Sequence, residues 1–280
     1  MSQLLEDALS RDGVAVTRAA YPEAAAAACA ACLAAGIDGL DRKLALPQTM
    51  AERMRGPSLR HFVPVCPPFA PCFAAVLRLS LAGEAGALLV AALGRDAELR
   101  ELQVIVSEPG AAAQDVHSDS NWGTERLVTV FIALHDVLDE RMGPTFFWPN
   151  THAPRCFPGG VWLPPSVSLA AERRSVWYAL RAGDAVLMDA CTWHRGGANT
   201  SGTRRSLLAA SFVASDRSDR VPRLGDYINE TELIKYLRVK QQPPHDREHD
   251  RLHAVRQNAR RQAARKERLD AVLLRDPQNN

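Results

Sequence analysis

From about residue 100 the hydrophobic period changes from helical to strand-like, and this change limits the possible folds more than any other feature of the sequence. The clearest segment is 127–134, LVTVFIAL, which is rich in the branched and aromatic residues that favour strands. Further short strands are predicted at 102–107, 116–119, 145–148, 161–163, 177–180, 185–188, 192–193 and 206–213. Short strands separated by turn residues predict an antiparallel sandwich or barrel.

Helical patterns flank this strand-rich region. Residues 3–11 carry apolar side chains on one face, Pro22 opens an alanine-rich helix, and residues 84–93 are typical of a buried helix. Val14–Val16 is predicted to be a short strand, whereas the proline-spotted stretch 43–72 indicates no clear element. The predicted fold class is therefore mainly β with flanking helices, within the α+β class.

Length and composition exclude several classes of protein. The chain has 280 residues, somewhat more than one typical domain, and its hydrophobic fraction of 46% is ample for a core. The net charge of +2 does not indicate a nucleic-acid partner, and no apolar run is long enough to span a bilayer. The N-terminus lacks the basic start and apolar core of a signal peptide. We therefore expect a cytoplasmic protein with reduced thiols, among which Cys29 and Cys32 are structural.

The composition changes again near Lys240. Residues 241–244, QQPP, indicate a linker, and 246–275 are predicted to form a helix. From 240 to 280 ten Lys and Arg residues stand against six Asp and Glu residues, so this segment is basic. We expect one domain over 1–239 and a linker with a basic helix over 240–280. The helix is either solvated and packed on the domain or a site for a protein partner or self-association.

Three residues of the strand-rich region have the chemistry of metal ligands. His117 and Asp119 flank Ser118 in a predicted strand, so their side chains point to one face while Ser118 points away. His194 lies on a distant predicted strand and can complete a set of two histidines and one carboxylate. Such a set holds one face of an octahedral iron(II) and leaves three positions for a cosubstrate and dioxygen. Alone, a His-x-Asp pair is a weak signal, so the surrounding segments decide its meaning.

Four segments around these residues have an order and spacing that closely resemble the phytanoyl-CoA dioxygenase family of iron(II)/2-oxoglutarate oxygenases. The segments are PG to HSD at 109–119, ALHDV at 133–137, MGPTFFWPNTH at 142–152, and GDAVLMD, WHRGGANTS and RRS within 183–206. The resemblance covers residues 100–213, extends more loosely to the N-terminal helix–strand–helix, and excludes the tail after 240. It implies a double-stranded β-helix, the jelly-roll or cupin-like core of that family.

The resemblance also implies roles for individual residues. The family's metal ligands correspond to His117, Asp119 and His194, and its 2-oxoglutarate-binding arginine corresponds to Arg205, eleven residues after the second histidine. A planar guanidinium suits this role, because it can bind a carboxylate through two parallel hydrogen bonds. Arg204 is the adjacent alternative, and strand alternation lets only one of the two face inward. We favour Arg205.

Other pocket residues follow from strand alternation and from nearness to the ligands. Thr129 and Phe131 share one face of their strand, predicted to be the interior one, so Thr129 is a candidate hydrogen-bond partner of the cosubstrate. Gln103, on an earlier strand, is a second candidate. Asn121 and Trp122 follow the first two ligands closely and are predicted to contact the substrate.

The chain departs from the family pattern at two positions. Asn150 stands where the family often has glycine, and asparagine tolerates the left-handed backbone conformation required there. Gly196 stands where some relatives of the resembled family have a hydroxyl that helps hold the cosubstrate. Which residue binds the cosubstrate oxygens in this chain is therefore an open question. Asp119 conforms, and it argues for hydroxylation, because halogenases of related fold have a small residue in place of the carboxylate.

The resemblance therefore implies an enzyme that uses iron(II), 2-oxoglutarate and dioxygen to hydroxylate an unactivated C–H bond. The expected substrate is a small molecule of secondary or of lipid or acyl metabolism. Desaturation and cyclisation share the same iron site, so the reaction outcome is open. Two alternatives also stay open: a non-catalytic binding or sensor protein on the same fold, and a metal-dependent cupin-type enzyme that does not use 2-oxoglutarate.

Overall fold

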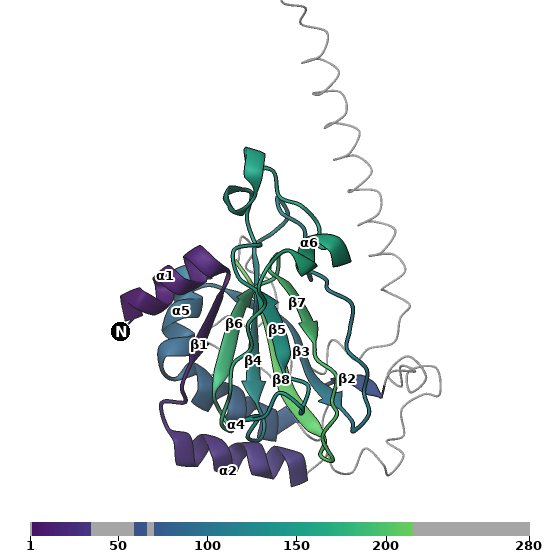
Figure 1. Cartoon of the computed structure of the whole chain (residues 1–280). Coiled ribbons are helices and arrows are strands. Elements are labelled where there is room, and N and C mark those ends of the chain that lie inside the picture. The colour runs from purple at the N-terminus through teal and green to yellow at the C-terminus, as the bar shows by residue number, and fades with distance from the viewer. Residues whose placement is uncertain (1, 35–58, 66–69, 215–280) are drawn as a thin grey trace, which may run out of the picture. The chain divides into compact units, whose positions relative to one another are not determined.

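The computed structural model describes residues 2–34, 59–65 and 70–214 of the chain (Figure 1). The predicted linker and basic helix of 240–280 lie outside the described residues, and so does most of the unassigned stretch 43–72. The domain boundary after 239 and the partner of the basic helix therefore stay predictions.

Two antiparallel sheets form the core of the described chain. The larger sheet has the strand order β1–β6–β4–β8–β3–β2, and all neighbouring strands in it are antiparallel. The smaller sheet pairs β5 (Thr145–Trp148) with β7 (Trp193–Gly196). The bounds of the larger sheet's strands are β1 Val14–Thr17, β2 Arg60–Pro64, β3 Glu98–Ser107, β4 Leu127–Ala133, β6 Ala185–Asp189 and β8 Arg205–Val213.

Helices gather on one side of the larger sheet, and the smaller sheet lies on its other side (Figure 1). In the described residues the N-terminal helices are α1 Ser2–Asp12, α2 Pro22–Cys32, α4 Ala70–Leu81 and α5 Glu84–Leu93. Their apolar faces pack on the sheet in one hydrophobic cluster, in which Leu77 and Leu89 are fully buried. Cys29 and Cys32 are buried free thiols of this cluster, as predicted. The predicted class, mainly β with flanking helices, is confirmed.

Strand β4 shows how the sequence positions the interior of the sandwich. Val130 and Ile132 belong to the cluster between the sheet and the helices, whereas Phe131 and Ala133 belong to a second cluster between the two sheets. Successive residues of a strand point to opposite faces, so a strand that is apolar on both faces separates two cores. The face of Thr129 and Phe131 is therefore the interior face, as predicted.

Three predicted strands are wrong, among them 116–119, where His117 makes only an isolated bridge with His194. Residues 161–163 are irregular and follow the short 3-10 helix η3 (Pro158–Gly160), while 177–180 make only an isolated bridge, from Leu180 to Val137. Short apolar runs do not distinguish strands from packed loops. In this region Trp162 packs instead and donates a side-chain hydrogen bond to the backbone of the 149–153 turn.

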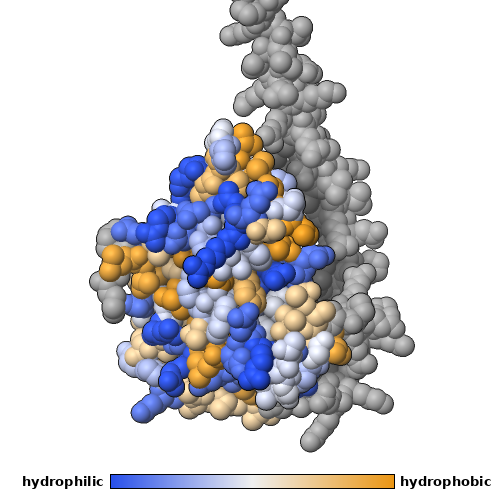
Figure 2. Space-filling model, viewed as in Figure 1, coloured by the Kyte–Doolittle hydropathy of each residue, from blue (hydrophilic) through white to orange (hydrophobic). Residues whose placement is uncertain are grey.

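The segment between β5 and β6 covers the outer face of the smaller sheet. It contains η2 (Pro154–Cys156), η3 and α6 (Val167–Ala171), and its buried side chains pack on Trp148 and Trp193. Val161 and Val167 of the same segment are exposed. Orange atoms gather toward the top of Figure 2, where Figure 1 shows this segment.

No single helix in the described residues is long and apolar enough to cross a membrane. Only α4, from Cys72, and α5 meet the length and composition test together, and they are bent by 80° at their junction.

Candidate active site

The three predicted ligands converge where residues 116–119 meet β7. Residues 116–119 do not form a strand; instead His117 makes an isolated antiparallel bridge with His194, with N···O distances of 2.9 and 2.8 Å. The backbone N–H of Asp119 donates to the carbonyl of Ala190 at 2.9 Å. Backbone hydrogen bonds therefore hold both halves of the triad against each other, although 76 residues separate the two histidines.

The side chains of the triad face one point. One ligand atom of each of His117, Asp119 and His194 lies within 4.8 Å of the others. The Nε2 atoms of His117 and His194 lie 3.9 and 3.5 Å from the two carboxylate oxygens of Asp119. His194 is buried, whereas the side chains of His117 and Asp119 are 38% and 39% exposed, so the triad is open on one side.

Hydrogen bonds orient both imidazoles for metal binding. Nδ1 of His117 lies 2.8 Å from the carbonyl oxygen of Asp115, and Nδ1 of His194 lies 3.0 Å from that of Thr192. A carbonyl can only accept, so each Nδ1 carries the proton and each Nε2 presents a lone pair toward Asp119. Burial lowers the pKa of His194 below the ordinary histidine value, which favours the neutral, ligating form. The donor set fits an iron(II) ion.

The triad opens into a cavity of about 240 Å³ between the two sheets. The cavity is lined by inward-facing side chains of β2, β3, β4 and β8 together with the triad itself. Predicted pocket residues Gln103, Thr129, Phe131 and Arg205 all lie on this lining. Asn121 and Trp122, predicted to contact the substrate, do not; both are exposed, Trp122 by 50%. Trp193 is fully buried on the opposite face of β7, as its strand parity predicts.

Arg205 and Arg204 face opposite ways. Arg205 is 1% exposed and lines the cavity; its Nε and Nη2 donate to the carbonyl of Gly143 at 3.2 and 2.7 Å. Its Nη1 is buried without a hydrogen-bond partner. Arg204 instead pairs with the carboxylate of Glu108 at 2.7 Å and is absent from the lining. Of the two adjacent arginines, Arg205 therefore faces the cavity.

A second buried arginine lines the same end of the cavity. Arg60 of β2 is 2% exposed, and its Nη2 donates to the carbonyls of Gly197 and Ala112 at 2.7 and 3.1 Å. Its Nε and Nη1 have no hydrogen-bond partner. Burial, together with the positive charge of Arg60, lowers the pKa of Arg205 to about 9. Neither arginine has a carboxylate partner in the part of the chain that the structure describes, so the two buried cations suit an anion.

Arg60 is not among the residues predicted from the sequence. It lies in the stretch 43–72, for which no element was predicted, and a lone arginine there carries no motif. The available signal was indirect. It is the glycine at 196, because a Cβ there would collide with the guanidinium of Arg60 and lie 2.7 Å from Oε1 of Gln114. The glycine makes room for the arginine.

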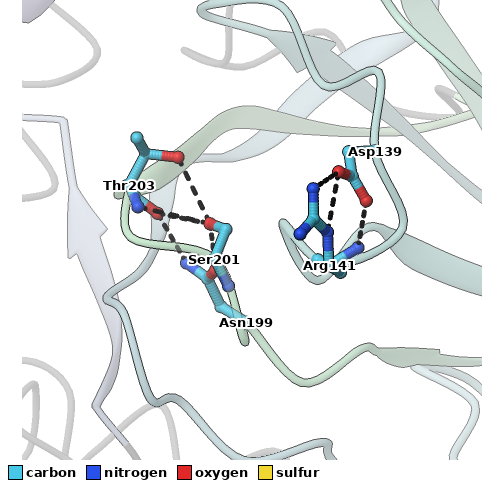
Figure 3. A network of polar contacts seen from close by, with 5 residues as sticks. All are labelled: Asp139, Arg141, Asn199, Ser201 and Thr203. Atoms are coloured by element: carbon cyan, nitrogen blue, oxygen red, sulfur yellow. Dashed lines mark hydrogen bonds and ion pairs between the residues drawn. The ribbon is translucent and has the colours of Figure 1, made fainter.

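A polar network orders the turn that precedes β8 (Figure 3). The side chain of Asn199 donates to the carbonyls of Ser107 and Thr203 at 2.8 and 2.9 Å and accepts from Ser201. The facing turn is closed by the Asp139–Arg141 ion pair, and the carbonyl of Arg141 accepts two backbone N–H groups of the 199–203 turn. These contacts fix where β8 begins, and Arg205 is its first residue.

The backbone turn at Asn150 also agrees with the sequence. Asn150 has φ of 58°, the left-handed conformation that asparagine tolerates. The neighbouring His152 is buried against α1, where its Nε2 lies 3.1 Å from the carbonyl of Ser10, so it is not part of the triad.

Residues 72–207 match the family model of phytanoyl-CoA dioxygenase. None of the curated proteins matches the chain.

Among solved structures, the epimerase SnoN in complex with Fe3+, alpha ketoglutarate and nogalamycin RO is 20% identical, with a TM-score of 0.56 over 76% of this chain and 83% of that one. HygX from Streptomyces hygroscopicus with nickel and 2-oxoglutarate bound is 13% identical, with a TM-score of 0.56 over 78% and 89%. AviO1 from Streptomyces viridochromogenes Tue57 is 18% identical, with a TM-score of 0.58 over 79% and 98%. These likenesses confirm the predicted jelly-roll fold.

Proposed function

Because residues 72–207 belong to the phytanoyl-CoA dioxygenase family of iron(II)- and 2-oxoglutarate-dependent dioxygenases, we propose that this protein hydroxylates an unactivated C–H bond of a small molecule. The observation that carries the proposal is the arrangement of His117, Asp119 and His194 beside two buried arginines. A facial triad with free Nε2 atoms, next to an anion site, suits an iron ion and a dicarboxylate together.

The chain's own residues have separate tasks in this proposal. His117, Asp119 and His194 hold the iron, and their Nδ1 hydrogen bonds keep the imidazoles in the ligating tautomer. Arg205 and Arg60 bind the carboxylate of 2-oxoglutarate that does not face the metal, through the N–H groups that lack partners. Bound iron(II), with 2-oxoglutarate and dioxygen, supplies the oxidation of the C–H bond.

The surrounding core protects this chemistry from water. Phe131 and Phe147 lie against the ring of His194, with centroid distances of 6.4 and 6.5 Å, and close the inner side of the triad. The open side is that of His117 and Asp119, where a substrate can enter. Exclusion of water from the inner side strengthens the contacts of the arginines with an anion.

Succinate release tests the proposal. The wild-type protein with iron(II) and 2-oxoglutarate is compared with His117→Ala and with Asp115→Asn, an exposed neighbour whose side chain makes no contact with the triad. We expect release in wild type and Asp115→Asn and none in His117→Ala. Metal binding without succinate release would favour the sensor alternative, and turnover that does not require 2-oxoglutarate would favour a cupin-type enzyme.

Product mass separates the possible outcomes on one iron site. Hydroxylation adds one oxygen, desaturation or cyclisation removes two hydrogens, and epimerisation leaves the mass unchanged. Two of the similar structures are of an epimerase and a carbocyclase, so the measurement discriminates between real alternatives.

A further inference from the structure

One cross-strand row of the larger sheet brings polar side chains into the cavity far from the arginines. Glu101 of β3 pairs with Ser211 of β8, and Ser211 pairs with Thr129 of β4, and all three line the cavity. We call Glu101, Ser211 and Thr129 the outer row. Arg205 is six residues from Ser211 along β8, which corresponds to about 20 Å of strand.

The triad lies between the arginines and the outer row. The ring of His194 faces Phe131, which pairs with Ala209, and Ala209 lies between Arg205 and Ser211 on β8. The backbone N–H of Asp119 donates to the carbonyl of Ala190, and the N–H of Ala190 donates to the carbonyl of Leu127. Leu127 is the first residue of β4 and lies beyond Thr129. A cosubstrate that joins the arginines to the triad therefore leaves the outer row to the substrate.

The outer row has unused hydrogen-bonding capacity. The hydroxyls of Thr129 and Ser211 lie 3.0 Å apart, and each can make a further hydrogen bond. Gln103, on the next row inward, lines the cavity, and its side chain has no hydrogen-bond partner among the residues that the structure describes. The carboxylate of Glu101 likewise has no hydrogen bond or ion pair within the described ranges.

The charges of the lining have opposite signs at the two ends of the cavity. Its cations, among described residues, are Arg60 and Arg205 at the inner end, whereas Glu101 and Asp119 lie toward the outer end. An anionic substrate, such as a carboxylate or an acyl thioester with phosphates, would meet like charge there. An ammonium group would meet the carboxylate of Glu101, which has no ion pair among the described residues.

We propose that the substrate is a hydroxylated small molecule that carries an amine. Its ammonium pairs with Glu101, and its hydroxyls bind Gln103, Ser211 and Thr129, so Thr129 and Gln103 recognise the substrate and not the cosubstrate. The inference rests on the proposed function and deepens it. It replaces the lipid or acyl substrate class expected from the family resemblance.

Three sugars that share one ring and differ in charge test the inference. Glucosamine, glucose and glucuronate are titrated into the full-length protein loaded with nickel and 2-oxoglutarate, and dissociation constants are measured by ligand-observed NMR. We expect glucosamine to bind most tightly and glucuronate least tightly. Glu101→Gln should weaken glucosamine binding by roughly three- to fivefold, the size expected of a partly exposed ion pair, and leave glucose unchanged.

Glu125→Gln is the matched control, because Glu125 is an exposed acid that pairs with Arg100 outside the cavity. It should leave all three affinities unchanged. Glucuronate binding as tight as that of glucosamine, no detectable binding of any of the three sugars, or an unaltered ranking in Glu101→Gln overturns the inference. Failure of nickel or 2-oxoglutarate to bind would instead contradict the proposed function. The three sugar affinities are therefore also ranked on metal-free protein, so that a failure of the substrate inference is distinguished from a failure of the proposed function.

Discussion

Replacing Arg205 by methionine should separate the stability of this protein from its affinity for 2-oxoglutarate. Arg205 is 1% exposed, and among the residues that the structure describes it has no acidic partner and donates hydrogen bonds only to the carbonyl of Gly143. Burial and the charge of Arg60 lower the pKa of Arg205 to about 9, so the folded protein holds this cation at a cost in free energy.

Two effects on the unliganded protein oppose each other. Loss of the donor to Gly143 costs about 1–3 kcal/mol, because the carbonyl is left buried and unsatisfied. Replacement of a buried charge by an apolar side chain of similar volume returns about 1–4 kcal/mol. We therefore expect the free energy of unfolding of unliganded Arg205→Met to lie within about 2 kcal/mol of wild type.

Binding of the cosubstrate should change far more. Each hydrogen bond to a charged group contributes about 1.5–3 kcal/mol, so loss of a bidentate pair weakens 2-oxoglutarate binding at least about a hundredfold. At a concentration of 2-oxoglutarate about 100 times the wild-type dissociation constant, the ligand stabilises the wild type by about 2.7 kcal/mol. In the variant this shift should fall to about 0.4 kcal/mol.

Chemical denaturation of the nickel-loaded protein, with and without 2-oxoglutarate, measures both quantities. Arg204→Met is the matched control, because its arginine pairs with Glu108 and is absent from the cavity lining. It should keep the full ligand-induced shift. A full shift in Arg205→Met, or a loss of more than about 4 kcal/mol in its unliganded form, would refute the reasoning.

Three further changes have expected outcomes. Gly196→Ala should displace the guanidinium of Arg60 and weaken 2-oxoglutarate binding roughly tenfold in calorimetry, while nickel affinity stays unchanged. Wild-type affinity of this variant for 2-oxoglutarate would contradict a role of the Arg60 guanidinium in binding it. Asn199→Ala removes the donors to two backbone carbonyls before β8 and should lower the free energy of unfolding by about 1–3 kcal/mol in urea, and an unchanged midpoint would count against the network. Asp119→Ala should reduce nickel affinity by more than about tenfold, and a smaller effect would argue against its role as a ligand.

Strand alternation explains why much of this site could be predicted. The period of two lets only one of Arg204 and Arg205 face inward, and the structure agrees. His117 and Asp119 also face one point, although residues 116–119 make an isolated bridge and no strand. The same rule assigns Thr129 to the interior. Metal-ligand chemistry then limits which inward-facing residues can act together.

Other features depend on contacts that periodicity does not encode. Residues 161–163 have the composition of a strand but form a loop, in which Trp162 packs against the cluster of Trp148 and Trp193. Asn121 and Trp122 are near the ligands in sequence yet outside the cavity, since chain proximity does not determine the direction of a loop. Arg60 reaches the site from β2, at the edge of the larger sheet, and local sequence around it indicates no such role.

Arg60 and Gly196 are best understood as one unit. The space that a side chain at 196 would occupy is filled by the guanidinium of a residue 136 positions earlier. The glycine thus admits a second buried cation beside Arg205, so the inner end of the cavity suits a carboxylate. Glu101 makes the outer end suited to a cation. A cavity with this gradient of charge would orient an anionic cosubstrate and an amine-bearing substrate toward opposite ends, on either side of the triad.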